Sequence, residues 1–443
     1  MNHIIIRKGH DIRIAGVPSQ EVTSVPGSET VAISPKTFRG VKPKLLVNEG
    51  DTVQIGSPLF FDKAKPNVKW ASPANGTVKT IQFGARRIIE KIEIKVDGSE
   101  SIQGQVFTSE QLTSANRTTI LNRILEANLF PLIRQRPFNK VANPNDFPRD
   151  IFISAVNTAP LSVDLDPVIE SEKAAFQAGV TALSKLTDGN VVVTSKKAME
   201  LQHAEVQTIS GPHPAGNVGI QIHQSKPIKP GEIIWSVNAQ HVITFGKLFL
   251  NGSYSPDILV TIAGPGATNP QTVSAKVGAR IGSLILNQDL SEPTRLISGN
   301  VLTGQTVEVD NFLGFYDSSV SIVLDSVDRP FMGMLAVGNS KSKYSLTNTF
   351  LTFGENIFNF NTAQNGELRA IVPINAWENV LPMDVYPNAL YRAILAHDIE
   401  EMEQLGMLEC DDEDFALCSF SCPSKIDVGK VIRDGLNMLE AEG

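Results

Sequence analysis

Two cysteines near the end of the 443-residue chain have the spacing of an incomplete iron–sulfur ligand set. The bacterial ligand run is Cys-x2-Cys-x2-Cys-x3-Cys-Pro, in which each cysteine supplies a thiolate. Cys418, Cys422 and Pro423 match the end of this run, whereas Asp412 and Phe415 stand where its first two thiolates belong. Because a 4Fe-4S centre needs four thiolates, we predict that the chain binds no cluster and no metal here. The run is then either a redox module that lost its metal or two buried cysteines before a turn.

A block of nine carboxylates without a basic residue extends from Asp398 to Asp414, just ahead of this run. Such a block is usually a solvated face, but a fixed negative patch also steers a basic partner. We therefore predict a partner interface around the end of the block and the cysteine run. Its predicted residues are Asp411, Asp412, Asp414, Cys418, Cys422 and Pro423.

A second group with possible chemistry lies between Phe130 and Lys140, where Arg134 and Arg136 alternate with aromatic residues and prolines, Phe138 among them. Such a rigid segment could hold an anionic or flat aromatic ligand through cation–π and stacking contacts. Alternatively, the arginines only pack on the surface of a domain. The sequence alone leaves both interpretations open.

A loop rich in glycine and proline, Gly211-Pro-His213-Pro-Ala-Gly216, follows a predicted strand of an open α/β sheet. Ligands of such sheets bind at the carboxyl ends of the strands. The loop matches neither Gly-x-Gly-x-x-Gly nor a phosphate loop, and its prolines remove backbone donors, so a dinucleotide site is weakly supported. His213 could donate a proton to a bound ligand, or it could be structural.

Composition limits the classes of function. The net charge of −8 argues against nucleic-acid binding, which needs clustered lysine and arginine. No apolar run approaches the ~18 residues that a membrane-spanning helix needs, and the N-terminus lacks the features of a signal peptide. Three cysteines gathered in one short stretch give no disulfide framework. These features predict a protein of a reducing compartment, by default the cytoplasm.

The first 105 residues have the turn spacing of a small barrel or sandwich. Two motifs, Val47–Leu59 followed by Ala71–Val78, resemble the two halves of the biotinyl/lipoyl barrel-sandwich hybrid. Their glycines are predicted at turns that need a positive φ, and their valines alternate into a core. We therefore predict a barrel-sandwich hybrid domain over 1–105.

The same fold in carrier proteins bears its cofactor on a hairpin lysine, and Lys65 occupies that position here. The neighbouring Pro66 changes the local backbone that a modifying ligase would recognise. We therefore predict no covalent cofactor, and we expect Lys63 and Lys65 to be solvated charges.

The rest of the chain predicts an α+β protein with several domains. A helix is expected at about 110–128 because apolar residues recur with helical spacing, and strands then alternate with helices as in an open sheet. The predicted regions are a helical linker with an open, Rossmann-like α/β domain over 106–257, a β-grasp (SLBB-like) domain over 258–330, an irregular connecting segment over 331–385 and a helical, ferredoxin-like domain without a cluster over 386–443.

This order of domains resembles the flavin-bearing NADH subunit of respiratory complex I and the related RnfC family. Several stretches are more closely similar to one family, the A subunits of the Na⁺-translocating NADH:quinone reductases. These stretches are Ile4–Gly9 with Ile14–Gly16, Arg134–Phe138, Gly211–Gly216, Phe245–Phe249, Ile297–Gly304 and Leu417–Pro423.

The resemblance implies a peripheral subunit on the cytoplasmic side of a bacterial inner membrane. The complex is a translocase that couples NADH oxidation and ubiquinone reduction to Na⁺ export. The partners implied are the five other subunits (B to F), chiefly the membrane-embedded B subunit. FMN, FAD, riboflavin and iron–sulfur centres are expected in those other subunits, and this chain is expected to bind none of them and to hold no catalytic residue.

The resemblance also implies a part in quinone handling, for which a flat and mostly apolar pocket is expected. The predicted quinone contacts are Arg134, Arg136, Phe138 and His213. A pure docking scaffold without a ligand is the alternative. A third hypothesis, an NADH:flavin dehydrogenase in its own right, predicts a yellow protein, whereas we expect a colourless one.

Overall fold

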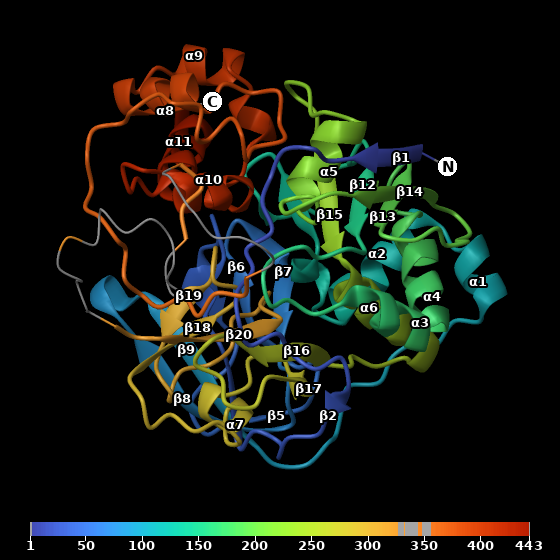
Figure 1. Cartoon of the computed structure of the whole chain (residues 1–443). Coiled ribbons are helices and arrows are strands. Elements are labelled where there is room, and N and C mark those ends of the chain that lie inside the picture. Colours follow the sequence, from blue (N-terminus) through green and yellow to red (C-terminus); the bar gives the residue numbers. More distant parts are fainter. Residues whose placement is uncertain (1, 327–331, 333–343, 348–355, 443) are drawn as a thin grey trace.

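The computed structural model describes residues 2–326, 332, 344–347 and 356–442, and it confirms the prediction of an α+β chain with several domains (Figure 1). Part of the segment predicted to be irregular, 331–385, lies outside the described residues. None of the described helices is long and apolar enough to cross a membrane.

The barrel region consists of two small antiparallel sheets that enclose an aromatic core. Phe60 stacks on Trp70 with ring centroids 4.6 Å apart, and both rings are buried. Gly50, Gly56 and Gly76 have positive φ, as predicted. The strands are β3 (Thr30–Ile33), β9 (Ile89–Val96), β8 (Gly76–Phe83) and β5 (Thr52–Val53) in one sheet, and β4 (Pro43–Leu45), β6 (Pro58–Asp62) and β7 (Lys65–Ala71) in the other.

Two N-terminal strands that fall within the predicted barrel pair elsewhere. β1 (Asn2–Ile5) adds a parallel edge strand to the α/β sheet, and β2 (Val22–Thr23) adds one to the β-grasp sheet. The start of the chain thus links all three β regions. Lys65 also differs from expectation, because its ammonium donates to the carbonyl of Val141 and is half-buried, whereas Lys63 is exposed.

The α/β region is built on a seven-stranded sheet in the order β1-β14-β13-β12-β15-β10-β11. The chain runs from β12 through β13 to β14 in one direction, and then returns to place β15 on the other side of β12. This makes the gap between the carboxyl ends of β12 and β15 the topological switch point of the sheet. The remaining bounds are β10 (Arg134–Arg136), β11 (Lys140–Val141), β12 (Ile151–Ser154), β13 (Val191–Ser195), β14 (Glu205–Ser210) and β15 (Ile234–Asn238).

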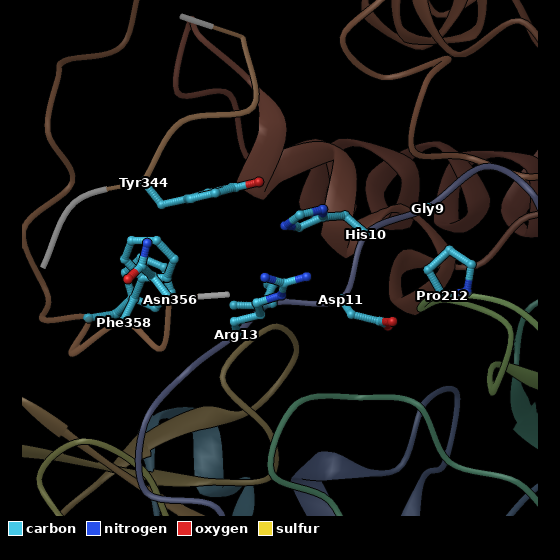
Figure 2. Close-up of a pocket in the computed structure, with 10 residues that line it drawn as sticks. Gly9, His10, Asp11, Arg13, Pro212, Tyr344, Asn356 and Phe358 are labelled. Atoms are coloured by element: carbon cyan, nitrogen blue, oxygen red, sulfur yellow. The ribbon is translucent and has the colours of Figure 1, made fainter. Parts of the chain in front are cut away.

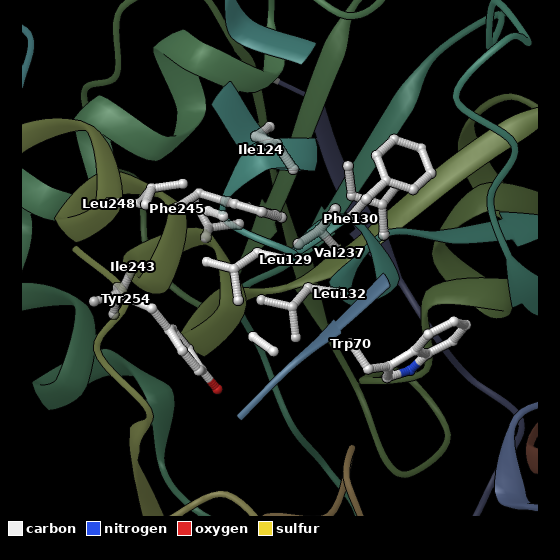
Figure 3. Close-up of a cluster of buried hydrophobic side chains, with 14 of the residues drawn as sticks. Trp70, Ile124, Leu129, Phe130, Leu132, Val237, Ile243, Phe245, Leu248 and Tyr254 are labelled. Carbon is white, nitrogen blue, oxygen red and sulfur yellow. The ribbon is translucent and has the colours of Figure 1, made fainter. Parts of the chain in front are cut away.

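Helices cover both faces of this sheet. Phe152 of β12 packs with α5 on one face, and Val237 of β15 packs in a large cluster with α6 on the other. Figure 3 shows that this cluster extends from Val237 and Phe245 to Trp70, so the barrel and the α/β region share one apolar core. The helices are α3 (Leu165–Ser171), α4 (Lys173–Leu183), α5 (Val218–Ser225) and α6 (Ala239–Asn251).

The helix expected at about 110–128 is in fact two helices, α1 (Ser109–Ser114) and α2 (Arg117–Glu126). Asn116 caps the second helix, since its side chain accepts from the backbone N–H of Thr119 at 2.9 Å. A capping asparagine inside an apolar helical pattern therefore marks a helix start that the periodicity does not reveal.

The β-grasp region has a six-stranded sheet in the order β19-β18-β20-β16-β17-β2, with one short helix, α7 (Ile281–Leu284). Its other strands are β16 (Asp257–Ala263), β17 (Gln271–Lys276), β18 (Thr294–Ser298), β19 (Gln305–Val307) and β20 (Ser319–Leu324).

The C-terminal region is helical and lies beside α5 and β1 (Figure 1). It begins with two helices, α8 and α9, because His397 ends α8 in the left-handed conformation. The helices are α8 (Pro387–Ala396), α9 (Ile399–Gln404), α10 (Ala416–Ser421) and α11 (Val428–Glu442).

Candidate functional site

Three of the residues predicted as a partner interface, Asp411, Asp412 and Asp414, belong to a buried arginine–carboxylate cluster. The cluster comprises Arg39, Arg136, Arg433 and residues 411–414. Arg136 is fully buried and its guanidinium lies 2.7 Å from Glu413 and 3.4 Å from both Asp411 and Asp414. Its charge is therefore satisfied inside the chain. Its contact with a quinone, which the sequence predicted, stays a prediction.

The aspartates of the cluster are held from several regions of the fold. Arg39 of the barrel lies 2.8 Å from Asp412 and 3.3 Å from Asp411, and Arg433 of α11 pairs with both aspartates. These arginines hold the pKa of Asp411 well below its usual range, despite its burial. Asp411 and Asp414 are buried, so they contact their own chain and present no surface to a partner.

Asp414 also lies at the amino end of α5. The amide of Asn217, the residue before this helix, donates to the Asp414 carboxylate at 3.2 Å. A Cβ on Gly219 would lie 2.0 Å from the same carboxylate, so only glycine allows this approach. Helix amino ends attract anions because of their free N–H groups and dipole. The chain's own carboxylate therefore fills the place at α5 where an anion would otherwise bind.

The cysteine run is packed as core. Cys418 and Cys422 are buried, and burial raises the pKa of the Cys418 thiol well above its ordinary value. Phe415, at the position of a missing thiolate, is fully buried too. Among the described residues no group of histidine, cysteine, aspartate and glutamate could hold a metal ion. Pro423 is the more accessible end of the run, and none of the cysteines forms a surface for a partner.

The loop containing His213 lies beside a pocket that its Pro212 helps to line, whereas His213 itself is not a lining residue. Its backbone N–H donates to Asp11 at 2.8 Å, and its ring lies 3.1 Å from the hydroxyl of Thr158. Burial lowers the pKa of His213 to about 4, so the imidazole is neutral near pH 7. The bond between His213 and Pro214 is cis. The geometry makes His213 a buried support for the N-terminal segment.

Arg134 and Phe138 are separated from one another. Phe138 packs on the apolar core of the C-terminal region, and its carbonyl accepts from Arg433 at 3.0 Å. Arg134 lies over the ring of Tyr316 at 5.2 Å and lines a crevice of about 360 Å³ at the switch point. The four predicted quinone contacts therefore do not form one site.

An aromatic pocket of about 440 Å³ lies between the N-terminal segment and residues 344 and 356–360, and Figure 2 shows its lining. The ring of His10 stacks on Tyr344 at 5.2 Å with an interplanar angle of 19°. Tyr344 meets Phe358 edge-on at 5.2 Å, and Phe358 stacks on Phe360 at 5.5 Å and 19°. Polar groups join this lining: Asp11, Arg13 and Asn356.

The series of rings continues to the cysteine run, because Phe360 contacts Phe420 at 6.3 Å, and Phe420 stands between the two run cysteines. The N-terminal segment is fixed to the pocket by backbone bonds from Phe358 to Arg13 at 2.8 Å and from Ala15 to Phe358 at 2.9 Å. These pocket residues were not predicted from the sequence. The only local hints of this pocket in the sequence are the polar residues between His10 and Arg13, which follow Gly9, and the alternate positions of Phe358 and Phe360.

Three domain families match the chain. Residues 4–97 match the NqrA N-terminal barrel-sandwich hybrid domain, residues 115–254 the NqrA second alpha/beta domain, and residues 259–309 the NQRA C-terminal domain. These matches agree with the barrel, the α/β region and the β-grasp region. They leave the ferredoxin-like character of the C-terminal helices a prediction.

Full-length relatives also match. The A subunit of the Na(+)-translocating NADH-quinone reductase from Saccharophagus degradans is 37% identical, over 99% of this chain and 100% of the relative. The protein of the same name from Vibrio anguillarum is 38% identical over the same shares of the two chains. Among solved structures, an NAD⁺-reducing nickel–iron hydrogenase matches at 12% identity with a TM-score of 0.39, over 74% of this chain and 62% of the hydrogenase chain.

Proposed function

Because the chain belongs to the family of A subunits of the Na⁺-translocating NADH:quinone reductases, we propose that it binds the quinone in its aromatic pocket and docks on the cytoplasmic side of the bacterial inner membrane. The five other subunits (B to F) are its proposed partners, and the chief contact is with the membrane-embedded B subunit. NADH oxidation and Na⁺ movement then belong to those partners.

One observation carries the quinone proposal: a pocket of about 440 Å³ with stacked aromatic walls and few polar groups. Small-molecule pockets commonly measure ~300–1,000 Å³ and are mostly apolar with a few orienting polar groups. A flat quinone ring fits between aromatic faces by offset stacking. The guanidinium of Arg13 and the amide of Asn356 supply donors suited to the two carbonyl oxygens of a quinone.

His10 contributes a ring and a neutral hydrogen-bonding group. Burial lowers its pKa, and Arg13 lowers it further, while Asp11 opposes the shift. A neutral imidazole has one N–H donor and one acceptor nitrogen, so it can bind a quinone carbonyl or a quinol hydroxyl. In this proposal the pocket positions the ligand and performs no chemistry.

The test is isothermal titration calorimetry of the purified chain with ubiquinone-1. Phe358→Ala and Tyr344→Ala should each weaken the affinity about tenfold, because each removes a stacking face. Phe147→Ala is the matched control, since Phe147 is exposed and its ring contacts Arg117 away from the pocket. Equal affinities in all variants would contradict the proposed pocket.

A docking role is favoured by a separate observation. Leu368, Val372 and Ile374 are all exposed in one short stretch that leads into the C-terminal region, and Tyr386 nearby in sequence is 71% exposed. Clustered exposed apolar side chains mark interaction surfaces. If ubiquinone-1 binds to neither the wild-type chain nor the variants, the pure scaffold is the better interpretation.

We also propose that the chain carries no flavin and no iron–sulfur centre of its own. The run keeps two cysteines, both are packed in the core, and the buried ring of Phe415 stands at the position of one missing thiolate. The natively purified chain should be colourless in the visible spectrum. Stoichiometric iron, sulfide or flavin would contradict this part of the proposal.

A further inference from the structure

The crevice at the switch point lies where all four regions of the chain meet. Its lining includes Arg39 from the barrel, Ser154 and Asn238 from the ends of β12 and β15, Ser298 from β18, and Glu413 from the C-terminal region. Open α/β sheets bind ligands in this crevice, because the loops diverge there and leave space. The lining is rich in hydroxyls and amides, in contrast to the aromatic pocket.

Arg134 provides a positive charge without a direct partner. It forms no ion pair with any carboxylate of the described residues, and its guanidinium lies over the ring of Tyr316. Asp317 belongs to the same lining and accepts from the Ser298 hydroxyl at 2.6 Å; burial raises its pKa, although Arg134 opposes the rise. The charge of Arg134 is therefore available to a ligand.

Ser236 lies directly opposite Arg134, since the two residues are register partners on β15 and β10. It is only 4% exposed, and its hydroxyl has no hydrogen-bond partner among the described residues. Leaving a buried polar group unsatisfied costs about 1–3 kcal/mol. A lining hydroxyl without a partner, beside a cation without a partner, indicates that both face a ligand.

Asn139, another residue of the lining, also has an unpaired buried polar atom. It is 5% exposed, its NH₂ donates to Asp411, and its side-chain oxygen has no partner among the residues that the structure describes. An unpaired acceptor calls for a donor on the ligand.

The remaining charges of the lining are compensated or absent. Asp411 and Asp412 are paired with Arg39 and Arg433. His241 is buried and its pKa is lowered to about 3, first by burial and then by Arg134, so it stays neutral. The net attraction at the Arg134 end is thus for an anion.

We propose that this crevice binds a small polar molecule with one carboxylate or phosphate group, which Arg134 and Ser236 hold, and with a hydroxyl or amide donor that reaches Asn139. The site is separate from the aromatic pocket, and the proposal does not depend on quinone binding. Neither the relatives' names nor the domain matches assign a ligand to it.

Calorimetric titration of the full chain with inorganic phosphate and, separately, with acetate tests the proposal and identifies the preferred anion. At least one of them should bind saturably, and Arg134→Ala should weaken that binding at least tenfold. Ser236→Ala should weaken it severalfold, and Arg134→Lys should restore part of it. Arg295→Ala is the matched control, because Arg295 is an exposed arginine paired with Asp325.

Two results would overturn the proposal: no binding of either anion, or equal binding in Arg134→Ala and Arg295→Ala. Ser236→Ala removes a single atom, so it keeps the test valid if Arg134→Ala fails to fold. The Phe358→Ala variant should bind the anion normally. Phe358→Ala tests the quinone pocket and Arg134→Ala tests the anion crevice. A negative result for one of these proposals therefore leaves the other proposal intact.

Discussion

The barrel and the C-terminal region attach to the α/β region in different ways. The barrel attaches through apolar packing, in which Trp70 joins the same core as Phe130 and Val237 (Figure 3). The C-terminal region also shares an apolar cluster, but it adds the buried arginine–carboxylate cluster at its contact with the rest of the chain. The barrel attachment combines this apolar area with hydrogen bonds such as that of Lys65 to the Val141 carbonyl, whereas the C-terminal attachment also contains buried ion pairs.

The difference explains how the incomplete ligand run keeps its shape. Asp412, at the position of the first missing thiolate, pairs with Arg39 and Arg433. Phe415, at the second position, is buried in the apolar cluster. Ion pairs and packing therefore hold the segment at the two positions where the motif would place metal ligands.

The largest effect is expected from Arg136→Ala. It leaves the ionised Asp411 buried without the Arg136 cation, and breaking a buried ion pair in this way costs about 3–5 kcal/mol. The free energy of unfolding, measured by urea denaturation, should fall by that amount. A loss below about 1 kcal/mol, typical of exposed pairs, would show that the cluster does not hold the C-terminal region.

Leu59→Ala in the barrel is the matched change for the apolar attachment. Leu59 is fully buried, and such a truncation costs about 2–5 kcal/mol through lost transfer free energy and the cavity left behind. Its cost should be the same at every pH, because no titratable group is involved. The cost of Arg136→Ala should vary with pH, and this contrast separates the two attachments even where their magnitudes overlap.

The same contrast explains what the sequence could predict. The barrel follows from local patterns, since Gly50, Gly56 and Gly76 mark turns and valines alternate between them. The cluster depends on Arg136 meeting Glu413, which lies 277 positions away, and no local pattern reports such a contact. The carboxylates of 411–414 were therefore expected at a surface, where unpaired acidic residues usually lie.

The aromatic pocket was missed for a related reason. His10 stacks on Tyr344 and Phe358 meets Tyr344 edge-on, although His10 is distant from both in the sequence. A bridge between Ile14 and Phe358 brings the two segments together. Arg134 was identified as a candidate residue because of its charge and its rigid neighbours. Its alignment with Ser236 depends on the pairing of β10 with β15, which the sequence did not indicate.

A smaller effect is expected from pH, and it belongs to the charged attachment alone. Burial raises the pKa of Asp414 from its ordinary value of 3.8 to about 8, and Glu413 and Asp411 add to the rise while Arg136 opposes it. Between these two pH values the folded chain binds more protons than the unfolded chain. Stability should therefore fall as the pH rises from about 4 to about 8, by at most about 1.4 kcal/mol per pH unit.

Urea denaturation of the wild type and of Asp414→Asn at several pH values between 5 and 8 checks this slope. The amide cannot ionise, so the variant should lose the decline, whereas Leu59→Ala should keep it. Asp411 acts in the opposite direction, because its lowered pKa contributes stability that is lost only as the pH falls below 3.8. If the free energy of unfolding of Asp414→Asn falls with pH at the same slope as that of the wild type, another group causes the pH dependence. Asp414 is then ionised beside Arg136 in the folded chain.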